Sequence, residues 1–188
     1  MLGLWITLGV IGGLILLVVL WLVGSYNSLV RLRNQSEEGY STMDVYMKKR
    51  YDLIPNYVET VKGYAKHEKE TLEKVIAARN GAMNAQSLED KAASEGQLSS
   101  VLKQLAVVIE RYPELKANSN FLNLQNQLST LESEIASARK YYNATVKTYN
   151  NKVEMFPSNI VARWFKFTRK PSFEITNAEE KVAPKVQF

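Results

Sequence analysis

An uncharged stretch at the start of the chain most strongly limits what this sequence can fold into. The first thirty positions, MLGLWITLGVIGGLILLVVLWLVGSYNSLV, hold no charged side chain, and the first charge is Arg31. A helix over residues 2–23 is roughly 30 Å long, the thickness of a bilayer's hydrocarbon core. Trp5 and Trp21 stand near its two ends, where amphipathic rings favour the membrane interface. The pattern predicts a transmembrane helix.

A cleaved signal peptide is the alternative interpretation of this stretch. It would begin with a basic segment, continue with a shorter apolar core and end in a small-x-small cleavage site. No Lys or Arg precedes the apolar run, and WLVGSYN is a poor cleavage site. We therefore expect a retained anchor over residues 1–25. Gly9 and Gly13 within it have the GxxxG spacing, which permits close helix packing, although glycines are common in membrane helices generally.

The charges beside the anchor predict its orientation. Arg31 and Arg33 follow the apolar run, and no basic side chain precedes it. By the positive-inside rule, the N-terminus lies outside and the rest of the chain lies in the cytoplasm. Glu37 and Glu38 follow closely, so the bias depends on two arginines.

Charge and cysteine content exclude several classes of site. The formal net charge of +5 is compatible with contact to anionic lipid or to nucleic acid. The sequence contains no cysteine, which excludes disulfides, thiolate nucleophiles and cysteine-based zinc sites.

The remainder of the chain has the periodicity of long helices. Apolar residues at spacings of three and four predict one helix from about Asn120 to Glu154, with a heptad-like seam typical of coiled coils. The seam consists of Phe121, Leu124, Leu128, Leu131, Ile135, Ala138, Tyr142, Val146, Tyr149 and Val153. A second apolar stripe starts at Leu98 and ends near Pro113, since the residue before a proline avoids the helical region.

A third stripe begins next to the anchor and reaches Pro55, which we expect to bend or restart the helix. Its members are Leu29, Leu32, Ser36, Tyr40, Met43, Met47, Tyr51 and Ile54. The polar, small-residue segment 84–96 reads as a hinge or loop. We expect an all-α fold, in which the N-terminal transmembrane helix precedes an antiparallel bundle of three to four long helices at 26–155. Residues 156–188 form a separate basic and aromatic C-terminal segment.

The segment from Lys48 to Glu70 is the natural place to look for chemistry, because it holds the only histidine, His67, together with Asp52 and Pro55. His67 stands among Lys66, Glu68, Lys69 and Glu70, a pattern typical of a solvated helix face. A metal site in a helical bundle requires a second histidine or a Glu-x-x-His pair, and the sequence contains neither.

The charged residues of the same segment predict packing rather than catalysis. Asp44, Lys48, Lys49, Arg50 and Asp52 read as ion pairs on the helix surface or as contacts to a neighbouring helix, with Asp52 or nearby groups capping the backbone freed by Pro55. We predict no catalytic, cofactor-binding or metal-binding residue and no cofactor.

The tail from Pro157 mixes aromatic and basic residues in NIVARWFKFTRKPSF. Three interpretations are open: the aromatic rings cap the bundle while the cations face water, the segment lies on an anionic membrane surface, or it binds nucleic acid. The absence of a recognised nucleic-acid motif argues against the third.

Several long stretches of the sequence resemble the LemA family of bacterial membrane proteins. They are YNSLVRLRN after the anchor, DVYMKKRYDLIPNYVETVKGYAKHE, the AARN at Arg79, YYNATVKTYNNKVEMFPSNIVARWFKF and the final APKVQF. The resemblance implies one transmembrane helix with the N-terminus outside, a helical bundle, a place in the bacterial cytoplasmic membrane and no established enzymatic activity.

Two functions follow from this reading. The first is a membrane-anchored structural or assembly protein that self-associates and organises the membrane or partner proteins. Its copies would meet along the membrane-proximal helix at Leu29, Leu32 and Met43, a face that a monomer would leave partly wet, with Gly9 and Gly13 as a weaker contact. The second is an adaptor for a separate membrane enzyme such as a protease or sensor kinase. The expected partners are the lipid bilayer, further copies and other membrane proteins, but not nucleic acid.

Overall fold

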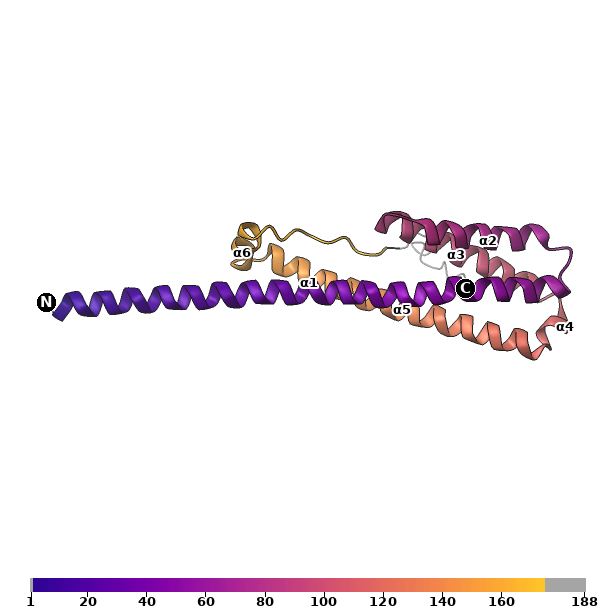
Figure 1. Ribbon diagram of the computed structural model, residues 1–188, viewed down its shortest axis with the longest axis horizontal. Coiled ribbons are helices and arrows are strands. Elements are labelled where there is room, and N and C mark those ends of the chain that lie inside the picture. The colour runs from indigo at the N-terminus through magenta and orange to yellow at the C-terminus, as the bar shows by residue number, and fades with distance from the viewer. Residues whose placement is uncertain (1, 175–188) are drawn as a thin grey trace, which may run out of the picture. The chain divides into compact units, whose positions relative to one another are not determined.

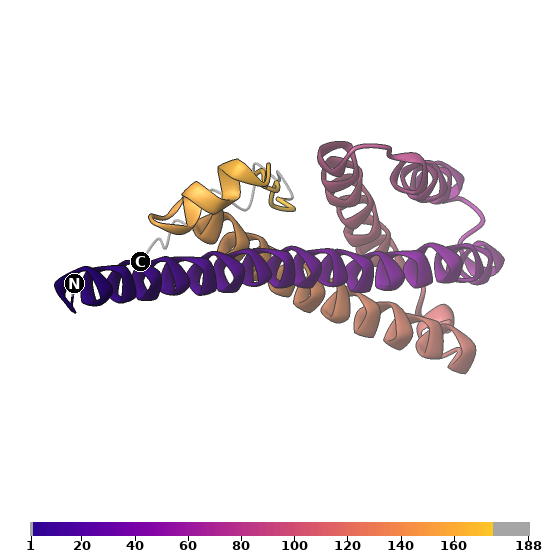
Figure 2. The ribbon, with the colours of Figure 1, turned by 60° about the vertical axis from the view of Figure 1, so that its left-hand side comes forward.

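The computed structural model describes residues 2–174, and every regular element in this range is an α-helix (Figures 1 and 2). The elements are α1 (Leu2–Tyr64), α2 (Lys69–Asn84), α3 (Leu88–Ile109), α4 (Pro113–Lys116), α5 (Ser119–Glu154) and α6 (Ser158–Trp164). The predicted all-α class is confirmed, and α5 has almost the predicted bounds. The final APKVQF lies outside the described residues.

α1 is one helix of 63 residues that passes through Pro55 without ending, so of the two predicted outcomes at Pro55, a bend or a restart, the restart does not occur. Its first part is the one segment of the described chain that is long and apolar enough to cross a membrane. The side chains of residues 2–21 are all exposed in the isolated chain, as those of a lipid-facing helix are. Length, composition and exposure together indicate a membrane protein.

The chain divides into two compact units, each of which takes part of α1 and part of α5. The span unit comprises residues 2–40 and 141–172. Within the described residues, the bundle unit comprises residues 41–140 together with Phe173 and Glu174. The predicted division at residues 25 and 155 stays a prediction.

In the bundle unit, the second part of α1 is joined to α2 and α3 by short turns, so consecutive helices run antiparallel, as predicted (Figure 1). Its interior is lined by Met43, Met47, Ile54, Val61, Val75, Leu98, Leu105, Ile109, Leu115 and Phe121, all buried. Tyr57 stacks on Phe121 with ring centroids 5.3 Å apart. Ala65 and Ala82 are also buried, whereas their neighbours Tyr64 and Met83 are exposed.

The predicted loop at 84–96 is limited to residues 85–87, and its extension to residue 96 is wrong, because α3 begins at Leu88. Ser87 is the N-cap: its hydroxyl accepts a hydrogen bond from the backbone N–H of Asp90 at 2.9 Å and donates one to the Asp90 carboxylate at 2.7 Å. Ala92 and Gly96 are buried, so the small residues that suggested a loop form a helix face that packs closely. The composition of the segment reflects tight packing rather than a hinge.

In the span unit, Leu29 is completely buried against Val161 and Ala162 of α6, with Leu22 and Phe167 at the edge of the cluster. The expectation that Leu29 stays partly wet in a monomer is therefore wrong, since the chain's own α6 covers it. Met43 is also fully buried. Leu32 is half-buried.

One glycine in the span unit permits close helix contact. A Cβ on Gly39 of α1 would lie 3.3 Å from the backbone Cα of Tyr142 and 3.3 Å from the ring of Tyr141, both on α5. The absence of a side chain at this position therefore lets the two helices approach.

After α6, the chain runs back along α5 without regular structure. Side chains of α5 form hydrogen bonds with the backbone of this returning segment. The Tyr142 and Tyr149 hydroxyls donate to the carbonyls of Pro171 and Thr168 at 2.9 and 3.0 Å. Asn150 both donates to the Lys170 carbonyl at 2.8 Å and accepts from the Lys170 N–H at 2.9 Å. These bonds hold residues 167–172 against α5.

Candidate functional site

The most unusual group in the bundle unit is a buried polar cluster centred on Arg50. α1 supplies Arg50 and Tyr51, α3 supplies Glu95, and α5 supplies Glu132. The Arg50 guanidinium forms ion pairs with Glu95 and, at 2.6 Å, with Glu132, while the Tyr51 hydroxyl donates to Glu95. Arg50 and Glu95 are only 1% and 2% exposed. The cluster therefore ties three helices together through charged hydrogen bonds, of which those to Glu95 are buried and the one to Glu132 lies at the edge of the interior.

Charge balance within the cluster keeps Arg50 ionised. Burial opposes the positive charge, but the carboxylates of Glu95 and Glu132 outweigh it and hold the pKa of Arg50 above its usual value. Burial, and then the adjacent Glu95 carboxylate, raise the pKa of the Tyr51 phenol, so the hydroxyl stays protonated and donates. Neither group is prepared to give up a proton near neutral pH.

Pro55 and Arg79 form a second part of this site. Proline has no N–H, so Pro55 leaves the carbonyl of Tyr51, four residues earlier, without its usual helical partner. Arg79 Nε of α2 donates to that carbonyl at 2.9 Å. The side chain of Arg79 thus replaces the missing backbone hydrogen bond, which explains how α1 continues through a proline. The predicted capping by Asp52 is wrong: Asp52 is exposed, and Arg79 fills that role.

Asp44 makes a smaller ion-pair group on the same helix. It pairs with Lys48 at 2.8 Å, as the i,i+4 spacing predicts, and with Lys91 of α3 at 2.6 Å. Burial acts to raise the pKa of Asp44, but the hydrogen bonds and charges of the two lysines prevail and lower it. The predicted pairing on the helix surface is confirmed for Asp44, whereas Arg50 is an interior group.

His67 is exposed, as predicted, but it lies in the turn between α1 and α2 rather than on a helix face. The neighbouring Glu68 accepts from Arg111 at 2.8 Å and from the Tyr112 hydroxyl at 3.1 Å, which ties this turn to the end of α3. Lys69 pairs with Glu73 at 3.7 Å, and Glu70 pairs with Lys74 at 2.7 Å. Residues 2–174 contain no group of three or more His, Asp or Glu side chains that could hold a metal ion.

Glu95 falls in the predicted loop at 84–96 and Glu132 lies outside the predicted apolar seam of its helix, so the sequence analysis identifies neither partner of Arg50. A signal for Glu95 was present: Ala92, Glu95 and Gly96 recur at spacings of three and four, which marks one helix face. No comparable signal singled out Glu132. The members of the cluster bind one another, and the hollow between α1 and α2 does not include Arg50, Glu95 or Glu132. The arrangement is suited to fixing the three helices against one another.

The fold and site thus define an all-α membrane protein whose helical unit is fixed by an interior charge network. The sequence profile of the LemA family matches residues 39–188, and the chain belongs to that family.

Curated relatives agree with this assignment. The chain is similar to Protein LemA of Metamycoplasma hominis, with 29% identity over 144 residues, which is 75% of this chain and 65% of the relative. It is also similar to Magnetosome protein MamQ 2 of Paramagnetospirillum magneticum, with 23% identity over 175 residues, and to Magnetosome protein MamQ of Magnetospirillum gryphiswaldense, with 22% over 174. Each of these two matches covers 79% of this chain and 64% of the relative, so the chain spans just under two thirds of the proteins it matches.

Proposed function

We propose that this protein is a membrane-anchored structural or assembly protein without catalytic activity, which self-associates and organises the membrane or partner proteins. The observation that carries the proposal is α1 itself, a single helix of 63 residues that leads from the apolar segment into the bundle unit with no loop between them. The similarity to proteins named for the magnetosome supports a role in membrane organisation.

The charge network supports a non-catalytic role. Arg50 and Glu95 are hydrogen-bonded to each other, and further to Glu132 and Tyr51, and neither lines the hollow between α1 and α2. Catalytic groups need a reachable cavity and a proton affinity near the working pH. The Arg50 cluster does not line the hollow between α1 and α2, and the pKa values of Arg50 and Tyr51 are shifted away from neutrality.

The proposal includes a single pass through the bacterial cytoplasmic membrane, with the N-terminal side outside and the bundle unit in the cytoplasm. Its support is Arg31 and Arg33 behind the apolar run. A reporter that is active only outside the cytoplasm, fused behind Phe188, is expected to stay silent. Strong reporter activity would reverse the orientation.

Self-association is proposed to use the apolar segment. In the isolated chain, an added Cβ on Gly9 or Gly13 meets no atom within 4 Å, so this face of α1 is open to a partner helix. Leu29 and Met43 are buried within the chain itself, so they are not available for the predicted contact between copies. The proposed contact between copies is therefore the face of Gly9 and Gly13 within the apolar segment, and no longer Leu29 and Met43.

The test is the mass and shape of the full-length protein in mild detergent. An assembly of several copies supports self-association, and Gly9→Ile with Gly13→Ile is expected to dissociate it. Ile11→Phe is the control, since it exchanges one large apolar side chain for another at the same depth on the opposite side of the helix. A monomer across a wide concentration range would refute self-association.

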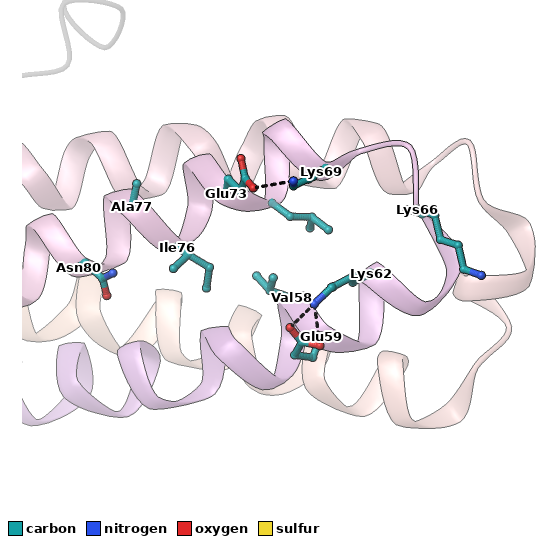
Figure 3. A pocket seen from close by; sticks show the side chains of 11 residues that line it. Val58, Glu59, Lys62, Lys66, Lys69, Glu73, Ile76, Ala77 and Asn80 are labelled. Carbon is teal, nitrogen blue, oxygen red and sulfur yellow. Dashed lines mark hydrogen bonds and ion pairs between the residues drawn. The ribbon is translucent and has the colours of Figure 1, made fainter.

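An adaptor that binds one membrane enzyme is the second candidate, and a specific groove favours it. A hollow of about 570 Å³ lies between the end of α1 and α2, with Val58, Leu72 and Ile76 along it (Figure 3). Its edge carries two ion pairs, Lys62 with Glu59 at 3.0 Å and Lys69 with Glu73 at 3.7 Å. An apolar groove with a charged rim fits a helix of a partner protein.

The groove can be tested without disturbing the core. Ala77 lines the hollow and is itself exposed, so Ala77→Trp fills the groove from its edge. If the protein is a monomer and Ala77→Trp abolishes its co-purification with a membrane enzyme, the adaptor function replaces the assembly function. An unchanged set of co-purifying proteins would argue against the groove.

A further inference from the structure

The segment around α6 is the least covered apolar surface outside the membrane span. Five large apolar side chains lie exposed between positions 155 and 165, namely Met155, Phe156, Ile160, Trp164 and Phe165. Phe156 and Trp164 are 78% and 72% exposed, which is more than most side chains of the apolar span. Large apolar side chains exposed together on one short segment indicate an interaction site.

The position of α6 along α1 identifies what this patch meets. Its inner face, Val161 and Ala162, packs on Leu29, and Leu22 at the end of the apolar run joins the same cluster. The ring of Phe165 lies 4.7 Å from that of Tyr26. Figures 1 and 2 both show α6 beside this part of α1.

The register of α1 gives the depth of these contacts. At 1.5 Å per residue, Tyr26 and Leu29 lie about 4.5 and 9 Å beyond Val23, the last residue of the apolar run. The polar layer of a bilayer extends roughly 5–8 Å beyond the hydrocarbon core on each side. If residues 2–23 span the core, α6 therefore lies at the level of the lipid headgroups.

The charges of the segment complement such a surface. Arg31, Arg163 and Lys166 are exposed, and no ion pair to any of them occurs among the described residues. The nearby carboxylates are already engaged, because Glu154 pairs with Arg169 at 2.8 Å and Glu37 pairs with Lys170 at 3.0 Å. Unpaired cations beside exposed aromatic rings are the combination that binds anionic headgroups and the acyl boundary below them.

Lys166 adds an independent indication. It ends α6 with φ at 57°, the left-handed conformation for which helix ends usually use glycine. The Phe167 N–H donates to the Ala162 carbonyl at 2.8 Å, and the Lys166 N–H donates to the Arg163 carbonyl at 3.2 Å, which is the hydrogen-bond pattern of a glycine cap. A lysine is strained at this position, so its presence favours a use for its charge.

We propose that the segment from Met155 to Lys166 is a lipid-docking site, which inserts its aromatic and aliphatic side chains into the interface of the membrane that α1 crosses and binds anionic headgroups through Arg163 and Lys166. The site rests on the membrane span but not on self-association. A second copy or a partner protein is the competing occupant, and the experiment distinguishes them.

The experiment uses the fluorescence of Trp164 in the full chain. Trp5→Phe with Trp21→Phe leaves Trp164 as the only tryptophan, and the protein is reconstituted into phosphatidylcholine vesicles with or without phosphatidylglycerol. Lipids brominated near the headgroup are expected to quench Trp164 more than lipids brominated near the chain end, and aqueous iodide is expected to quench it weakly. The companion variant Trp5→Phe with Trp164→Phe reports the span through Trp21.

Variants separate lipid binding from folding. Lys166→Gly relieves the backbone strain, so the fold is retained, but the ratio of lipid-docked to undocked Trp164 is expected to fall about fivefold in vesicles with phosphatidylglycerol, the equivalent of about 1 kcal/mol per cation. Lys147→Gln on α5 removes an equal charge away from α6 and is expected to change nothing.

Two results would overturn the proposal. Full quenching of Trp164 by iodide with none by brominated lipid would place it in water. Protection from both quenchers would place it in a protein contact. If Trp21 also escapes the brominated lipids, the membrane span itself fails, which is a different outcome from the failure of the docking site.

Discussion

The two units solve the problem of buried polar groups in different ways. The bundle unit buries charges, with Arg50 paired to Glu95 and Glu132. The span unit uses neutral donors, with Tyr142, Tyr149 and Asn150 bonded to backbone carbonyls. The difference follows from the local backbone: helices satisfy their own N–H and C=O groups, whereas the segment at 167–172 has no such partners and needs side-chain donors.

This contrast predicts that the largest single loss of stability occurs in the bundle unit. Arg50→Met leaves the Glu95 carboxylate buried without its cation and is expected to lower the free energy of unfolding by about 3–5 kcal/mol. Urea unfolding of the full chain in mild detergent, followed by circular dichroism, measures it. Lys62→Ala, which breaks an exposed pair, serves as the control and is expected to cost less than about 1 kcal/mol. A loss of that small size for Arg50→Met would remove the distinction between the two units.

The span unit is expected to respond to loss of a neutral donor by a smaller amount. Asn150→Ala removes two hydrogen bonds to the backbone of Lys170 and leaves buried groups unsatisfied, which costs about 2 kcal/mol. Asn151→Ala, an exposed neighbour on α5, is expected to cost a few tenths at most. Equal effects of the two substitutions would show that residues 167–172 are not held by Asn150.

The pairing of Pro55 with Arg79 predicts a coupling rather than a simple loss. Arg79→Met leaves the Tyr51 carbonyl unpaired and is expected to cost about 1–2 kcal/mol. In a Pro55→Ala background the cost is expected to be about 1 kcal/mol smaller, because an alanine at this position restores the backbone N–H that proline lacks. A double-mutant cycle measures the coupling, and additive effects would show that Arg79 does not compensate for the proline.

The smallest expected effect is the acid response of Asp44. Its pKa is lowered in the folded state, so its contribution to stability is present above the unfolded pKa near 3.9 and is lost as pH falls through the folded value. Asp44 is partly exposed, which keeps this contribution below about 1 kcal/mol. Asp44→Asn is expected to flatten the change in unfolding free energy between pH 5 and pH 2. An unchanged acid response would assign it to other carboxylates.

Regular periodicity allowed much of the fold to be predicted. The α5 seam from Phe121 to Val153 is buried or half-buried throughout, and the stripe from Leu29 to Ile54 is likewise covered. Such stripes are readable because a helix shows its core face every three to four residues. Even Ser36, the polar member of the α1 stripe, is buried, with its hydroxyl donating to the Arg33 carbonyl at 2.6 Å.

The failures have a shared physical cause. Pro55 alone predicts an interruption of the helix, but Arg79, 24 positions later, supplies the hydrogen-bond donor that the proline lacks. Glu95 reads as a loop residue until Arg50 of another helix neutralises it. Each of these interpretations depends on a partner distant in sequence, and local propensity carries no information about that partner.

The central claim about the candidate site is that the Arg50 cluster is a packing device and not a reactive centre. A buried ion pair that only joins helices can be replaced by apolar groups of similar volume without loss, whereas removing one partner alone is costly. The decisive measurement is the unfolding free energy of the triple variant Arg50→Met, Tyr51→Phe and Glu95→Leu. We predict that it recovers to within about 1 kcal/mol of the unaltered chain. A triple variant as unstable as Arg50→Met alone would contradict this account of the site.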